Sequence, residues 1–153
     1  VFSVDSKRYG FNHRGELVTG LQQVRTEDGI FNFYFGEEGI MRTGKQSIYD
    51  EDLGENQTWF FYTDGSSKGR GYHGIRDNSV YRQGLRLSAD RDLKYAPVEL
   101  DGVSYLVNAS GTIQRASSSS KSHTRPELGA GYKDISDTND KVWTVDTNGI
   151  ILP

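Results

Sequence analysis

The sequence predicts an all-β fold, an elongated solenoid of about five or six short, stacked β-hairpins. Two observations predict it. A short unit recurs around five glycines, with an aromatic residue six positions before each glycine and an apolar residue four positions before it. An apolar residue also stands two positions after four of these glycines. The glycines are Gly15, Gly39, Gly65, Gly111 and Gly149.

Each unit has the composition of a β-hairpin. Its aromatic run has strong strand propensity, and polar residues such as Asp-Gly and Asn-Gly, which tolerate positive φ, supply the turn. The side chains at −6 and −4 share one face of the strand, so we expect them to fill the core of the stack. These core aromatics are Tyr9, Phe11, Phe33, Phe35, Phe61, Tyr105 and Trp143.

The residue five positions before each glycine lies on the opposite face of its strand. Tyr34 and Phe60 hold this position in two units, with Trp59 beside Phe60. These three residues are the candidates for ligand binding. The alternative for the same side chains is packing between neighbouring units.

The repeats are expected to extend over residues 7–115 and to be degenerate over 73–100, where one glycine interval is 46 residues. A degenerate unit is expected around 80–87. The Ser-rich residues 116–124 are typical of an exposed loop or linker. Residues 125–153 are expected to form a final, atypical repeat or cap.

Composition disfavours several classes of protein. No cysteine is present, and His13, His73 and His123 lack zinc-ligand spacing, so no metal is expected. No run of 18 apolar residues exists, which excludes a transmembrane helix. The net charge of −3 argues against nucleic acid. Residues 66–94 nevertheless hold seven basic and three acidic residues, which indicates either affinity for an anionic polymer or a solvated face.

The sequence contains no catalytic constellation. It has no Gly-x-Ser-x-Gly elbow, and its carboxylate clusters lie in predicted turns rather than in a pocket. Residues 134–140 are similar to a calcium loop, but Asn139 replaces its glycine and Val145 its closing acidic residue, so a turn is expected. We expect no enzyme activity and no cofactor.

Residues 9–20 and 33–44 resemble the cell-wall-binding repeat family, the choline-binding and glucan-binding repeats of Gram-positive surface proteins. Residues 101–115 resemble it as well. The resemblance implies a hairpin solenoid that holds a secreted protein on the bacterial cell surface. The implied partner is a cell-wall polymer, either teichoic acid bound through its choline or a glucan, and cation–π attraction to aromatic rings would hold the choline.

The chain departs from this family after the closing glycines, where Leu21 and Lys45 replace a tryptophan on which the choline cage draws. The sequence therefore predicts a non-catalytic module that binds cell-wall polymer or carbohydrate, with choline disfavoured. The alternative is a structural or protein-interaction stalk without glycan binding. The start at Val1, without a signal sequence, indicates a piece of a larger protein that carries other domains.

Overall fold

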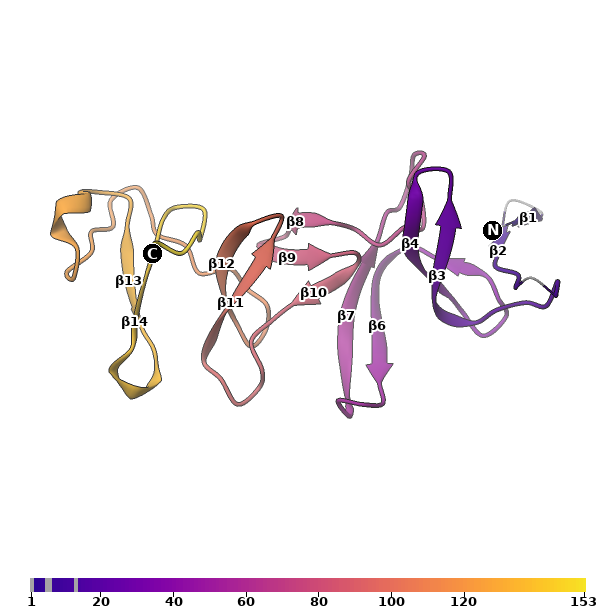
Figure 1. The fold of residues 1–153 in the computed structure, drawn as a ribbon, viewed down its shortest axis with the longest axis horizontal. Coiled ribbons are helices and arrows are strands. Elements are labelled where there is room, and N and C mark those ends of the chain that lie inside the picture. Colours follow the sequence, from indigo (N-terminus) through magenta and orange to yellow (C-terminus); the bar gives the residue numbers. More distant parts are fainter. Residues whose placement is uncertain (1, 5–6, 13) are drawn as a thin grey trace. The chain divides into compact units, whose positions relative to one another are not determined.

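The computed structural model describes residues 2–4, 7–12 and 14–153 (Figure 1), and His13 of the first predicted turn lies outside them. The described residues are all-β, which confirms the predicted class, and they form several small antiparallel sheets. Two short 3-10 helices, η1 (Pro126–Leu128) and η2 (Thr138–Asp140), interrupt the strands. The chain divides into two compact units, residues 1–73 with 81–86, and residues 74–80 with 87–153.

The first unit is built from hairpins. Its strands are β1 (Phe2–Val4), β2 (Lys7–Tyr9), β3 (Gly20–Thr26), β4 (Gly29–Phe35), β5 (Met41–Arg42), β6 (Gly44–Asp50) and β7 (Glu55–Phe61). The first unit also holds residues 81–82 of β9 (Ser79–Arg82) and residues 85–86 of β10 (Leu85–Leu87). The second unit contains β8 (Gly74–Arg76), β11 (Tyr95–Leu100), β12 (Val103–Asn108), β13 (Lys133–Ser136) and β14 (Val142–Val145).

The aromatic strands β4 and β7 each form the second half of a long hairpin, as Figure 1 shows. β3 pairs with β4 from Gly20 opposite Phe35 to Thr26 opposite Gly29. β6 pairs with β7 in the same way, from Gly44 opposite Phe61. The sequence predicted only a short strand after each glycine. It did not predict the strands before the aromatic runs, β3 and β6, that pair with β4 and β7.

That short strand after the glycine is also present. The residue at −4 lies opposite the residue at +2 in four of the five units: Phe11 opposite Leu17, Phe35 opposite Met41, Val107 opposite Ile113, and Val145 opposite Ile151. The unit at Gly65 differs, because Phe61 pairs with Gly71 instead of Ser67. Ser67 is the one polar residue at +2, and residues 62–70 form a wider loop, closed where the Tyr62 N–H donates to the Arg70 carbonyl at 2.9 Å.

Both faces of the aromatic strands are largely buried, so for Phe60 at −5 the structure favours packing over exposed contact, the two alternatives that the sequence left open. Phe60 and Leu106 at −5 are 9% and 0% exposed, while Phe35 and Phe61 at −4 are 1% and 0% exposed. Leu106 belongs to a core with Ile135 and Val145 in the second unit. A sheet covered on two sides hides the period-two pattern that marks one solvated face.

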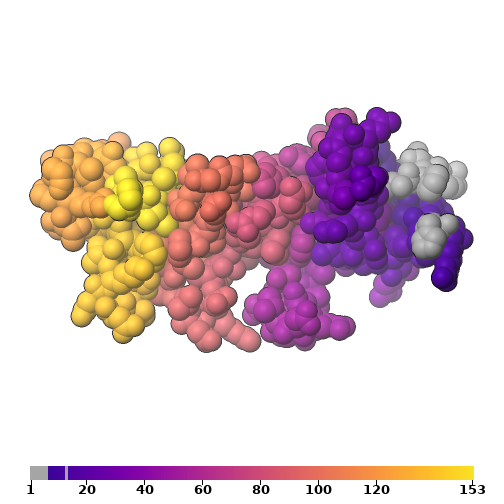
Figure 2. Space-filling model, in the orientation of Figure 1, coloured from indigo at the N-terminus to yellow at the C-terminus, as the bar shows by residue number. Residues whose placement is uncertain are grey.

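The β6–β7 hairpin ends in a tip, residues 49–55, that carries two exposed apolar side chains among four acidic residues. Tyr49 and Leu53 at this tip are 60% and 53% exposed. In Figure 2 the hairpin, coloured purple to magenta, projects as a distinct lobe. Exposed apolar side chains on a hairpin tip are available for contact with a partner.

Candidate functional site

The first unit contains a stack of three aromatic rings. The Tyr34 and Phe61 ring centroids lie 6.2 Å apart with an angle of 17° between the planes, and those of Trp59 and Phe61 lie 6.0 Å apart with an angle of 7°. Phe61 is fully buried, Trp59 is 7% exposed and Tyr34 is half-buried. β4 supplies Tyr34, and β7 supplies the other two rings.

Four other rings form a second cluster, in which Tyr72 contacts each of the other three. Its ring lies 5.7 Å from Phe60 and 6.0 Å from Tyr81, both nearly edge-on, and 5.0 Å from Tyr62. Phe60 and Tyr81 are buried at 9% and 4% exposure, while Tyr62 and Tyr72 are half-buried. The cluster therefore has a buried floor and a partly accessible pair of tyrosines.

Backbone hydrogen bonds hold this cluster in place. The Tyr72 N–H donates to the Phe60 carbonyl, the Phe60 N–H to the Gly84 carbonyl, and the Gly84 N–H to the Tyr72 carbonyl, each at 2.8 Å. Three chain segments thus meet at one point. A ligand at the tyrosines would meet a surface whose backbone is already ordered, which reduces the entropy lost on binding.

Trp59 carries a buried donor. Its Nε1 is the one buried side-chain polar atom without a hydrogen-bond partner among the described residues. A buried N–H without an acceptor is unfavourable by about 1–3 kcal/mol.

The structure divides the other predicted core aromatics into three groups by burial. Phe33 and Phe35 are buried, with their ring centroids 6.3 Å apart. Tyr9, Tyr105 and Trp143 are half-buried. Phe11 is 36% exposed, and its partner Leu17 is 51% exposed.

Trp143 makes two polar contacts that its sequence position did not reveal. Its indole Nε1 donates to the Asp137 carboxylate at 2.9 Å, and the Lys141 ammonium lies 4.0 Å from its ring centroid. The Trp143 hydrogen bond, together with the one from the Thr138 N–H, lowers the pKa of Asp137. A cation is therefore already placed against the Trp143 ring.

Asp134 anchors the Ser-rich segment and the residues after it. Its carboxylate accepts hydrogen bonds from the Ser122 hydroxyl, from the backbone N–H groups of His123 and Thr124, and from the Thr144 hydroxyl. Burial raises the pKa of Asp134, but the hydrogen bonds from Ser122, Thr124 and His123 outweigh it and lower the pKa to about 2. The segment that resembles a calcium loop thus contributes a carboxylate to a structural network.

Acid should weaken the second unit through Asp134. Because its folded pKa of about 2 lies below its ordinary value of 3.8, the stabilisation is complete above that ordinary value and is lost as the pH falls toward 2. We expect a loss of about 1–2 kcal/mol, allowing for solvent screening. Urea unfolding, followed by Trp143 fluorescence in a Trp59→Phe background, measures it at about pH 6 and about pH 2.5.

The matched control is Asp140→Asn, which removes an exposed carboxylate from the same unit. Asp134→Asn should lower the urea midpoint near neutral pH and reduce the difference between the two pH values, although Asp137 still titrates. Equal acid sensitivity in the wild type and in Asp134→Asn would contradict the assignment.

Among the described residues, no cluster of three His, Cys, Asp or Glu side chains is placed to hold a metal ion. His73 Nδ1 accepts a hydrogen bond from the Gln83 N–H at 3.2 Å.

Within the part of the chain that the structure describes, no helix has the length and apolar character needed to span a bilayer.

Comparison with known proteins gives similarity at the level of structure. No family model and no curated protein matches the sequence. The structural neighbours are choline-binding proteins of Streptococcus pneumoniae. CbpJ is 16% identical, and the match covers 99% of this chain and 47% of CbpJ with a TM-score of 0.41.

Two structures of choline-binding protein F show the same level of similarity. One, in complex with ipratropium, is 16% identical, with 95% of this chain and 42% of that chain covered and a TM-score of 0.37. The other is 17% identical, with 95% and 44% covered and a TM-score of 0.33. The chain therefore spans less than half the length of each structure it matches.

Proposed function

We propose that this chain is a non-catalytic module that attaches a secreted protein to a bacterial surface polymer through aromatic contacts. The observation that carries the proposal is the concentration of aromatic rings in the first unit, where a stack of three rings and a separate cluster of four rings each join distant chain segments. Sugar rings and quaternary ammonium groups are the ligands that such surfaces bind by stacking and cation–π attraction.

The hairpins are proposed to stack as a solenoid. Within the first unit, Tyr9 at −6 forms an isolated bridge with Ile40, which follows the next repeat glycine. Tyr105 and Ile150 form the equivalent bridge within the second unit. Contacts between successive repeats at the same positions support a repeating stack, and so does the marginal stability of a lone hairpin. We also propose that residues 116–124 are the loop or linker that separates the repeats from the final, atypical repeat or cap.

Three roles are proposed for the aromatic residues. Tyr62 and Tyr72, both half-buried, present ring surface to the ligand. Tyr34, also half-buried, presents ring surface at the edge of the separate stack with Phe61 and Trp59. Phe60 and Trp59, which are buried, support the two ring groups, Phe60 beneath Tyr72 and Trp59 against Phe61. Choline and sugar remain alternative ligands, and competition separates them.

The double substitution Tyr62→Ala/Tyr72→Ala should reduce retention on Gram-positive cell walls by about tenfold or more, since each lost aromatic contact weakens binding by about 0.5–2 kcal/mol. Co-sedimentation with purified walls, with and without excess free choline, measures this. Tyr49→Ala is the matched control, because it removes a tyrosine that is 60% exposed at the β6–β7 tip. Circular dichroism checks that both variants fold.

Retention that choline abolishes would identify a quaternary ammonium site, and retention that choline leaves unchanged would identify a sugar or anionic polymer. If the double variant binds walls as well as the wild type does, the site assignment fails. Absence of retention in the wild type would favour the alternative, a protein-interaction stalk. The exposed Tyr49 and Leu53 of the β6–β7 tip are the surface that favours this alternative.

A further inference from the structure

A basic pocket of about 430 Å³ lies in the first unit, apart from the aromatic cluster. Four cationic residues from three chain segments line it: Arg8 from β2, Arg25 from β3, and Lys68 and Arg70 from the loop after β7. Lys68 and Arg70 belong to the basic stretch 66–94 that the sequence singled out. Two of the seven basic residues of that stretch therefore line this pocket.

Arg70 is held in a fixed position. Its side chain is 15% exposed, and Nη1 lies 3.1 Å from the Asp28 carboxylate. Its guanidinium carbon lies 4.5 Å from the centroid of the Phe31 ring. The neighbouring Gly71 N–H donates to the Asn32 carbonyl at 2.8 Å, which ties the loop to β4. An arginine ordered before binding loses little side-chain entropy when it meets an anion.

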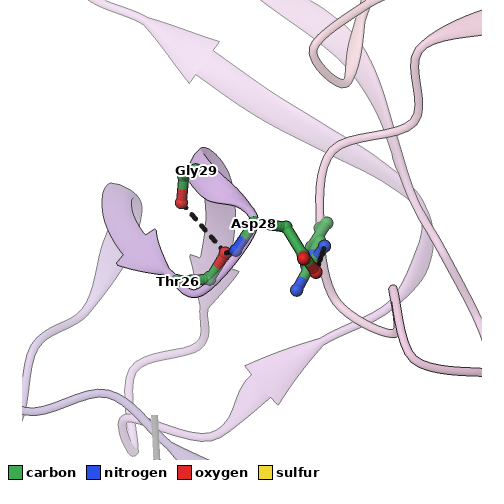
Figure 3. Close-up of polar contacts among 4 residues, drawn as sticks. Thr26, Asp28 and Gly29 are labelled. Carbon is green, nitrogen blue, oxygen red and sulfur yellow. Dashed lines mark hydrogen bonds and ion pairs between the residues drawn. The ribbon is translucent and has the colours of Figure 1, made fainter.

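The turn between β3 and β4 closes one wall of the pocket. Figure 3 shows the Thr26 hydroxyl donating to the Gly29 carbonyl at 2.9 Å, and the Asp28 N–H donates to the same hydroxyl at 3.2 Å. These bonds order the turn that positions Asp28 toward Arg70. Thr26 and Ser66 add hydroxyl groups to the lining.

Positive charge dominates the pocket. Glu27 and Asp28 are its acidic lining residues, against four cations. Asp28 is 68% exposed and pairs with Arg70. Cations that converge on one cavity from separate segments are suited to an oxyanion, and guanidinium groups are matched to the tetrahedral geometry of phosphate. A neutral sugar would not neutralise the excess of positive charge in this lining.

We propose that this pocket binds phosphodiester groups of an anionic surface polymer. The identity of that polymer rests on the function proposed above, but phosphate binding by the pocket does not depend on the aromatic cluster. The module would then hold one chain by two kinds of contact, with aromatic rings on its apolar or sugar parts and this pocket on its phosphates. Two weak sites on one polymer raise the overall affinity by avidity.

The test uses the full chain and isothermal titration with three probes: a poly(glycerol phosphate) oligomer, free inorganic phosphate and a neutral dextran. The oligomer should bind, its affinity should fall as salt rises, and dextran should not compete at this pocket. Arg8→Gln/Lys68→Gln should weaken oligomer binding by about tenfold or more, as expected for loss of two charge-assisted contacts.

The matched control is Lys7→Gln/Lys45→Gln, which removes the same charge from exposed residues of β2 and β6 that do not line the pocket. It should weaken oligomer binding by less than about twofold, an effect of net charge alone. Equal weakening by the two double variants, failure of the oligomer to bind, or equally tight binding of inorganic phosphate would each overturn the proposal. Loss of wall retention in Tyr62→Ala/Tyr72→Ala with oligomer binding intact separates the aromatic proposal from this one.

Discussion

Replacing Phe61 by alanine should destabilise the first unit by about 3–5 kcal/mol, the range for truncating a fully buried phenylalanine. Phe61 has no exposed surface and lies between Tyr34 and Trp59, with ring centroids at 6.2 and 6.0 Å. The substitution leaves a cavity between two rings whose strands are fixed by pairing, so the site cannot readily collapse. Urea unfolding followed by Trp59 fluorescence in a Trp143→Phe background measures the loss.

Two further variants separate packing from a general effect of aromatic loss. Phe61→Leu keeps most of the buried volume and should restore a large part of the stability. Tyr49→Ala removes a ring that is 60% exposed and should change the unfolding free energy by less than about 0.5 kcal/mol. If Phe61→Ala and Tyr49→Ala unfold at the same urea concentration, the stack does not stabilise the first unit.

The sequence predicted the turns of this fold better than it predicted which strands pair. A glycine that follows polar residues at a fixed distance after an aromatic run is local chemistry, and it correctly placed Phe35 opposite Met41 and Val107 opposite Ile113. The partner of β4 on its other edge is β3, which contains Gln22, Gln23 and Arg25 and has little apolar content. Strands of that composition carry weak signals, because pairing and not burial holds them.

Burial of the candidate residues could not be predicted from alternation alone. Phe60 and Leu106 stand on the −5 face, for which the sequence left exposed contact and packing as alternatives. Each is covered by residues distant in sequence: Tyr72 and Tyr81 pack on Phe60, and Ile135 packs on Leu106. Long-range contacts of this kind have no signature in a window of a few residues. Tyr62 and Tyr72 lie outside the −6 to −4 positions and were missed for the same reason.

The basic pocket shows a second limit of sequence reasoning. The excess of cations in 66–94 is legible in the sequence, but Arg8 and Arg25 lie far outside that stretch. Only the fold brings them to Lys68 and Arg70. Conversely, the other arginines of the stretch do not line this pocket, so a local charge count overstates which residues act together.

The second large effect is expected from Gly71→Ala. An added Cβ would lie 2.6 Å from the carbonyl carbon of Gln83 and 2.9 Å from the Gly84 nitrogen, which are backbone atoms. Backbone cannot turn aside as a flexible side chain does, so we expect a loss of about 3 kcal/mol or more, at or above the upper end of overpacking effects. The Gln83 carbonyl also accepts a hydrogen bond from the Asn32 side chain at 2.8 Å, and that bond is lost if the 83–84 turn moves.

Gly54→Ala is the control for Gly71→Ala, since an added Cβ there meets no atom within 4 Å and only the φ of +67° opposes it. That strain should cost about 1–2 kcal/mol. Displacement of the 83–84 turn also moves Gly84, whose N–H donates to the Tyr72 carbonyl at 2.8 Å. Gly71→Ala should therefore lower both stability and wall retention at temperatures where it is still folded, whereas Gly54→Ala should lower stability alone. Equal effects of the two substitutions on retention would contradict the proposed link between this close backbone approach and the ligand surface.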